Sequence, residues 1–217
     1  MTMLTSIVAA ALAVVGDPST KFAISPAGPG VGRHAGALGG GMMTRSRGGA
    51  LPAITVDYAY GLSPKVDVFA NASFGINVNE DFGVLGVIDP GARIRLTAPG
   101  SVDFGIKLGG ELTFLIFANG QGAAYVYLGG VPGLFVSGGS STVRGTFGLD
   151  FPTYFAEATN AFGVGDIDGI GVAVRPYLSL EGAIDEDTKL FVKGEAEVGV
   201  AELEGLLYAV IALGASF

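Results

Sequence analysis

The chain has 217 residues, of which 37 are glycine, only 15% are charged and none is cysteine. The length suits one all-β domain, and the glycine content disfavours a helical bundle, because each glycine inside a helix costs about 1 kcal/mol relative to alanine. The lack of cysteine excludes disulfides and cysteine-bound metals, and a formal net charge of −8 argues against a nucleic-acid partner.

The first 16 residues are mostly apolar and end in small side chains, with Ala11-Leu12-Ala13 as a candidate cleavage site. We interpret residues 1–16 as a signal peptide. The segment has no Lys or Arg ahead of its apolar core, so a first core strand or a short buried helix is the alternative. Residues 17–33 contain three prolines and are expected to form an irregular lead-in, which either hangs free or tucks into the mouth of the domain that follows.

From residue 51 onward, apolar residues recur at alternate positions in segments that end in polar or glycine-rich turns. Within residues 102–116, for example, Phe104 and Leu108 fall on one face and Lys107 and Glu111 on the other. This period of two predicts β-strands that are apolar on one face only. The predicted strands cover residues 34–44, 51–61, 65–78, 82–97, 102–117, 122–137, 142–156, 168–183, 188–201 and 206–217.

Charged residues inside these segments all fall on the face opposite the apolar one. They are Asp57, Asp67, Asp89, Arg93, Arg95, Asp103, Lys107, Glu111, Arg144, Asp150, Arg175, Glu181, Lys193, Glu195 and Glu197. The mean hydropathy of +0.54 is high, yet no stretch after the N-terminal segment reaches the roughly 18 apolar residues of a membrane-spanning helix. Because the apolar face also carries glycines that lipid would tolerate and a packed core would not, we predict a transmembrane β-barrel. A soluble sandwich or lipocalin-like barrel is the alternative.

The prediction is an antiparallel up-and-down barrel of about ten strands over residues 34–217, and counts from eight to twelve fit. Single-chain bacterial barrels have an even number of strands, short periplasmic turns and longer outer loops. The connections at 62–64, 98–101, 138–141 and 184–187 are therefore predicted to be periplasmic, together with both termini. The outer loops then lie at 45–50, 79–81, 119–121, 158–167 and 202–205.

The C-terminal segment carries a resemblance to a known class. Leu207, Ala209, Ile211, Leu213 and Ala215 alternate up to the terminal Phe217. This pattern resembles the closing strand of bacterial outer-membrane β-barrel proteins, and the segment Tyr58 to Val68 resembles their strand-turn-strand units. The resemblance implies a porin-like barrel in the outer membrane of a Gram-negative bacterium, surrounded by lipid and assembled by the barrel-assembly machinery, which would read Phe217 as its signal. It carries no subfamily motif, so it implies no activity.

The sequence offers few candidate catalytic residues. His34 is the one histidine of the chain and has no Ser-Asp arrangement near it, so we expect a structural or rim residue, no enzyme activity and no cofactor. Asp57 and Asp67 flank a predicted turn, and charge balance with Arg93 or Arg95 is the expected role.

Acidic residues also gather in the predicted outer loops. Asp166 and Asp168, with Glu157 nearby and Glu80 and Asp81 on another loop, could bind a hard cation such as Ca²⁺. A solvated acidic rim is the favoured interpretation.

About ten strands leave a lumen that side chains nearly fill, whereas open channels need about sixteen. Tyr125, Tyr127 and Tyr177 add bulk on the charged face. We therefore predict a charged, mostly occluded lumen and a structural or surface-interaction protein of undefined oligomeric state. The alternative is a narrow pore for small solutes or ions, lined by Asp103, Lys107, Glu111, Arg93, Arg95, Arg144, Asp150, Arg175, Lys193, Glu195 and Glu197.

Overall fold

The computed structural model describes residues 23, 30–44, 49–77, 83–97, 102–117, 125–140, 142–159, 163–165, 170–185, 188–201 and 205–217. These residues contain twelve strands: β1 (His34–Thr44), β2 (Leu51–Ser63), β3 (Val66–Asn77), β4 (Gly83–Arg95), β5 (Val102–Phe117), β6 (Tyr125–Gly139), β7 (Val143–Asp150), β8 (Thr153–Thr159), β9 (Gly163–Gly165), β10 (Gly171–Ala183), β11 (Lys189–Ala201) and β12 (Gly205–Ser216). Across this described part of the chain, no helix is long and apolar enough to cross a membrane.

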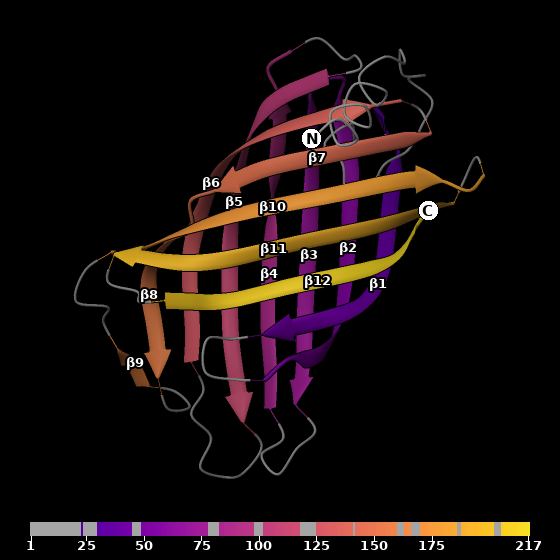
Figure 1. Ribbon diagram of the computed structural model, residues 1–217. Coiled ribbons are helices and arrows are strands. Elements are labelled where there is room, and N and C mark those ends of the chain that lie inside the picture. The colour runs from indigo at the N-terminus through magenta and orange to yellow at the C-terminus, as the bar shows by residue number, and fades with distance from the viewer. Residues whose placement is uncertain are drawn as a thin grey trace, which may run out of the picture.

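The strands form a closed antiparallel barrel (Figure 1). Neighbours in sequence pair around the wall, and β12 pairs with β1 to close it. β7 and β8 together occupy one position, because both pair with β6 on one side and β10 on the other. The wall therefore has ten strand positions, with β9 added beside β8. The predicted ten-stranded antiparallel barrel is confirmed.

Two local differences from the sequence prediction lie at the same place. The predicted strand over residues 142–156 is interrupted at Phe151 and Pro152, which separate β7 from β8. Proline has no backbone N–H to donate to a ladder, so it favours such a break. The region predicted as an outer loop at 158–167 contains the end of β8 and all of β9.

The barrel has two ends, which we name by their connections. The turn end carries the start of β1, the end of β12 and the tight turn Pro64–Lys65. The loop end carries the end of β1 with the start of β2, and the end of β3 with the start of β4. In Figure 1 the C-terminus marks the turn end at the upper right.

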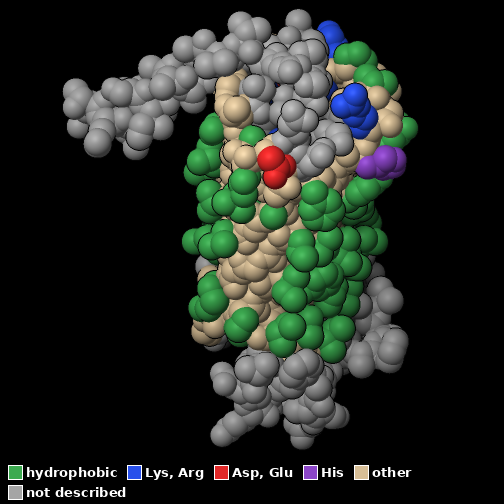
Figure 2. Space-filling view, turned by 90° about the vertical axis from the view of Figure 1, so that its right-hand side faces the viewer, with side chains coloured by type: hydrophobic (Ala, Val, Ile, Leu, Met, Phe, Trp, Pro, Cys, Tyr) green, Lys and Arg blue, Asp and Glu red, His purple; other side chains and the backbone are tan. Residues whose placement is uncertain are grey.

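Apolar side chains face outward around the wall. Ile211 and Leu213 on β12 are 66% and 70% exposed, whereas Asp150 and Glu181 are completely buried. Figure 2 shows hydrophobic side chains over the flank of the barrel, with the visible charged side chains confined to its upper end. A soluble barrel would arrange these residues the other way round, because its apolar face forms the core. The exposed apolar flank matches the lipid-facing surface of a membrane barrel.

Phe217 sits at the seam that closes the barrel. Its backbone N–H donates to the oxygen of Gly36, and Gly36 N–H donates to the oxygen of Phe217, both at 2.8 Å. A Cβ atom at Gly36 would lie only 3.1 Å from the Phe217 ring. The terminal aromatic ring therefore packs over a glycine of the first strand.

Candidate functional site

The charged residues of the predicted lumen all lie inside the barrel. Lys193 and Glu195 are half-buried. The others are buried, namely Arg93, Arg95, Asp103, Lys107, Glu111, Arg144, Asp150, Arg175 and Glu197. Alternation along each strand turns them inward together, because successive side chains point to opposite faces.

Arg175 on β10 forms the centre of the interior and is only 1% exposed. Its Nη2 atom lies 3.0 Å from Asp150 Oδ2 and 3.3 Å from Asp89 Oδ2. Its Nη1 atom pairs closely with Glu111 and lies 3.5 Å from Glu197 Oε2. One guanidinium thus joins carboxylates from β4, β5, β7 and β11, which is the planar, multidentate pairing to which arginine is suited.

Two tyrosines extend this central network. The Tyr154 hydroxyl contacts carboxylate oxygens of both Glu111 and Glu197. Tyr208 accepts a hydrogen bond from Arg175 Nη1 at 2.8 Å. Both tyrosine side chains are almost completely buried, so they fill the cross-section as well as satisfying buried polar groups.

Lys107 on β5 is the second cation of the centre. Its Nζ atom lies 2.5 Å from Asp89 Oδ2 and 2.6 Å from Asp150 Oδ2. The rings of Phe69 and Tyr177 lie 5.1 and 5.7 Å from the same atom, close enough for cation–π attraction. The ammonium group is therefore held from several sides by side chains of β3, β4, β7 and β10.

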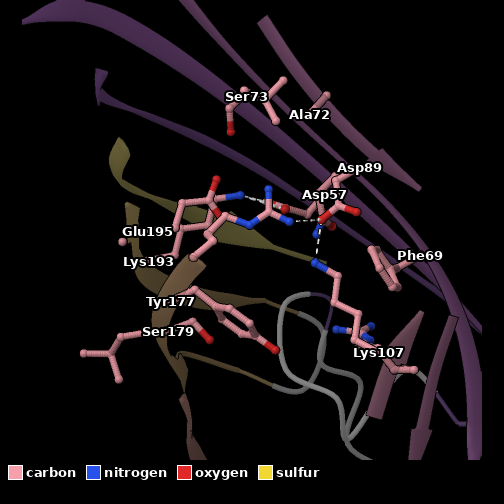
Figure 3. A pocket seen from close by; sticks show the side chains of 16 residues that line it. Asp57, Phe69, Ala72, Ser73, Asp89, Lys107, Tyr177, Ser179, Lys193 and Glu195 are labelled. Carbon is pink, nitrogen blue, oxygen red and sulfur yellow. Dashed lines mark hydrogen bonds and ion pairs between the residues drawn. The ribbon is translucent and has the colours of Figure 1, made fainter. Parts of the chain in front are cut away.

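A cavity lies beside this network, and Figure 3 shows the side chains around it. About 60 Å³ is open to the centres of water molecules, which is room for several of them. Across it, Lys193 Nζ on β11 contacts both carboxylate oxygens of Asp57 on β2 at 2.7 Å. Phe69, Asp89, Lys107, Tyr177 and Glu195 line its other sides.

Further ion pairs occupy the turn end. Arg93 Nε donates to Asp67 Oδ1 at 2.6 Å, so Asp67 has one of its expected partners. Asp57 pairs with Lys193, rather than with Arg93 or Arg95 as the sequence suggests. Arg144 pairs with Asp103 and donates to Ser137.

Apolar clusters lie inside the barrel on either side of the charged network. Along β1, Ala35 and Ala37 belong to a cluster at the turn end, and Met43 belongs to one at the loop end. The loop-end cluster also contains Ala53, Leu85, Val87, Tyr208 and Val210. Along β4, Leu85 and Val87 come directly before Asp89, so the charges begin where this apolar cluster stops.

Aromatic rings inside the barrel pack over glycines of other strands, most of them on the adjacent strand. A Cβ atom at Gly105, for example, would lie 2.4 Å from the Phe135 ring. The same contact joins Phe69 to Gly91, Phe191 to Gly39, Tyr154 to Gly129 and Tyr177 to Gly148. Inward glycines beside inward aromatics were the signal available in the sequence.

The other candidate residues lie apart from this network. His34 is exposed at the turn end, where its ring contacts Tyr58 and Tyr60. Asp166 and Asp168 lie outside the described residues. Among the residues that the structure describes, no group of three His, Cys, Asp or Glu side chains could hold a metal ion.

Comparison with known proteins identifies a fold. No protein-family model matches the chain, and no curated protein matches its sequence. Among solved structures, it is similar to the outer membrane protease OmpT of Escherichia coli, with 9% identity, a TM-score of 0.53, and coverage of 85% of this chain and 96% of that one. It also matches the N-terminal β-barrel domain of Pseudomonas aeruginosa OprF, with 12% identity, a TM-score of 0.35, and coverage of 86% and 98%. The similarity to OmpT shows that the chain has the fold of bacterial outer-membrane β-barrels.

Proposed function

We propose that this protein is an integral β-barrel of the bacterial outer membrane with an occluded lumen, acting as a structural or surface-interaction protein. The apolar flank and the barrel fold support the membrane location. Arg175 supports occlusion most directly, because its buried guanidinium joins carboxylates from four other strands across the middle of the lumen. A solute could pass this point only if these buried ion pairs separated, which is costly in a low-dielectric interior.

The proposed topology places the turn end in the periplasm, with both termini there. Tight turns such as Pro64–Lys65 are typical of the periplasmic side of bacterial barrels. Phe217 is proposed to serve the assembly machinery, and the protein is proposed to have no enzymatic activity.

Conductance tests the occluded lumen. The purified, refolded protein in a planar bilayer is expected to give a flat current trace. Folding is checked in the same preparation by a gel mobility that shifts on boiling. Steady single-channel steps from the folded protein would contradict occlusion.

A narrow pore for small solutes or ions is the competing function, and the cavity beside Lys193, which has room for several water molecules, favours it. The variant Lys193→Glu separates the two. In a pore it would shift ion selectivity toward cations, because a negative charge would replace a positive one beside the path. In an occluded barrel, neither the parent nor the variant would carry current.

A further inference from the structure

The chain reverses direction just before β1. Arg33 N–H donates to Gly30 O at 3.2 Å, and Gly32 N–H donates to Gly61 O at 2.8 Å. Gly30 and Gly32 have φ values of +80° and +71°, in the left-handed region that favours glycine. We call residues 30–33 the strap, because they fold back over the end of β2.

The strap crosses the inner side of the wall at Gly61. This glycine is buried and lies on the inward face of β2. A Cβ atom there would lie 2.0 Å from Gly30 O, 2.6 Å from Gly30 C and 3.2 Å from Val31 N. All three of these atoms belong to the strap, so the missing side chain at Gly61 is what makes room for it.

Ala23 provides a second contact between the N-terminal segment and the lumen. It is only 2% exposed and belongs to one apolar cluster with Ala35, Ala37 and Phe191. These three side chains face inward from β1 and β11. The chain ahead of the strap therefore has a residue seated inside the turn end.

We propose that Ala23 and the strap form an internal latch that closes the turn end of the lumen. The latch blocks access from that end to the charged interior. It must move before a solute can reach three buried residues that lie together at the turn end, Lys189, Glu181 and Ser216. This inference goes beyond the proposed function and does not depend on the membrane in which the barrel resides.

Cysteine labelling tests the latch, because the chain has no cysteine of its own. The reporter is Ser216→Cys, since Ser216 is 1% exposed and lies opposite Ala37 in the β1–β12 ladder. In detergent micelles, a water-soluble maleimide is expected to label it slowly. Adding Gly61→Ala is expected to raise the labelling rate about tenfold or more, because overpacking displaces the strap.

The matched control is Gly40→Ala, where the nearest atom to a new Cβ is 4.0 Å away. It should leave the labelling rate unchanged. Equal rates in folded Gly61→Ala and Gly40→Ala proteins, or rapid labelling of Ser216→Cys alone, would overturn the latch.

A disulfide cross-link tests the latch even if the Gly61→Ala protein fails to fold. The pair Ala23→Cys and Ala37→Cys is expected to form a disulfide on mild oxidation, because both positions belong to the turn-end cluster. The control pair Ala23→Cys and Ala53→Cys should not, because Ala53 lies in the loop-end cluster. Failure of the first pair to cross-link would also overturn the proposal. Neither measurement involves conductance, so the outcome is distinct from that of the bilayer experiment.

Discussion

At the scale of single residues, the carboxyl groups at the centre of the barrel outnumber the cations that hold them. The carboxyl groups of Asp89, Glu111, Asp150 and Glu197 all pair with Arg175, and Lys107 supports only the first and third of them. A buried carboxylate without a partner is strongly destabilising, so removal of a shared cation affects several acids at once.

Arg175→Met is therefore expected to lower the free energy of unfolding by about 3–5 kcal/mol, the range observed when one partner of a buried ion pair is removed. Urea unfolding of the refolded protein in lipid vesicles would measure it. Lys65→Met is the control, because Lys65 is exposed in the turn between β2 and β3, and surface changes usually stay within about 0.5 kcal/mol. Similar losses for both variants would contradict the central role of Arg175.

The ion pairs also show which contacts a sequence pattern can predict and which it cannot. Alternation predicts that Asp57, Asp67 and Arg93 point inward, and the partnership of Asp67 with Arg93 follows from neighbouring strands. The partner of Asp57 is Lys193, 136 positions further along the chain. Strand pattern alone does not reveal which residues meet across a lumen, because that depends on the tilt and stagger of the closed barrel.

At the scale of strands, inward glycines set how closely neighbours can approach. The Phe135 ring of β6 lies across Gly105 of β5, and Ile94 O of β4 is also close to the position that a Cβ would take there. Gly110 of β5 faces outward, and the nearest atom to a Cβ at that position is 3.7 Å away. The two glycines thus differ in face and in available space.

Gly105→Ala is expected to lower the free energy of unfolding by about 1–3 kcal/mol, because an added methyl group must displace a ring and a backbone oxygen. Gly110→Ala should be neutral or slightly stabilising, since an unstrained Gly→Ala change reduces the entropy of the unfolded chain. Urea unfolding of both variants would test this difference. Equal losses of unfolding free energy in the two variants would mean that the contact between Gly105 and the Phe135 ring does not determine stability.

The strand pattern predicted most elements but not the contents of the lumen. It placed the first strand over His34–Thr44, the range that the structure has. It did not anticipate that Met43, Phe135 and Phe191 fill part of the interior, because a two-class pattern of apolar and polar residues assigns large apolar groups to the lipid side. The glycines opposite them were visible, but their partners depend on register.

At the scale of the whole molecule, the outward apolar flank and the inward charges together define the barrel. Composition and alternation predicted this arrangement and the number of strand positions. Topology across the membrane follows a different rule, based on the lengths of the connections.

Labelling in intact bacteria would test that topology. Two single-cysteine variants sample the two ends of the barrel. Gly49→Cys lies ahead of β2 at the loop end, and Lys65→Cys lies in a tight turn. Both native residues are exposed. A maleimide polymer too large to cross the outer membrane should label only the first. After the outer membrane is opened, both should react. Labelling of Lys65→Cys alone in intact cells would mean that the barrel has the opposite orientation.

The central ion pairs have a consequence for the order of folding. Arg175 joins Asp89 across 86 positions, and Lys193 joins Asp57 across 136. Both contacts have very large sequence separations, which make their formation entropically costly and slow. An open sheet in lipid would hold these charges without partners, so the last strands gain their full stabilisation only when the wall closes. Closure of the barrel and neutralisation of its interior are therefore a single cooperative step.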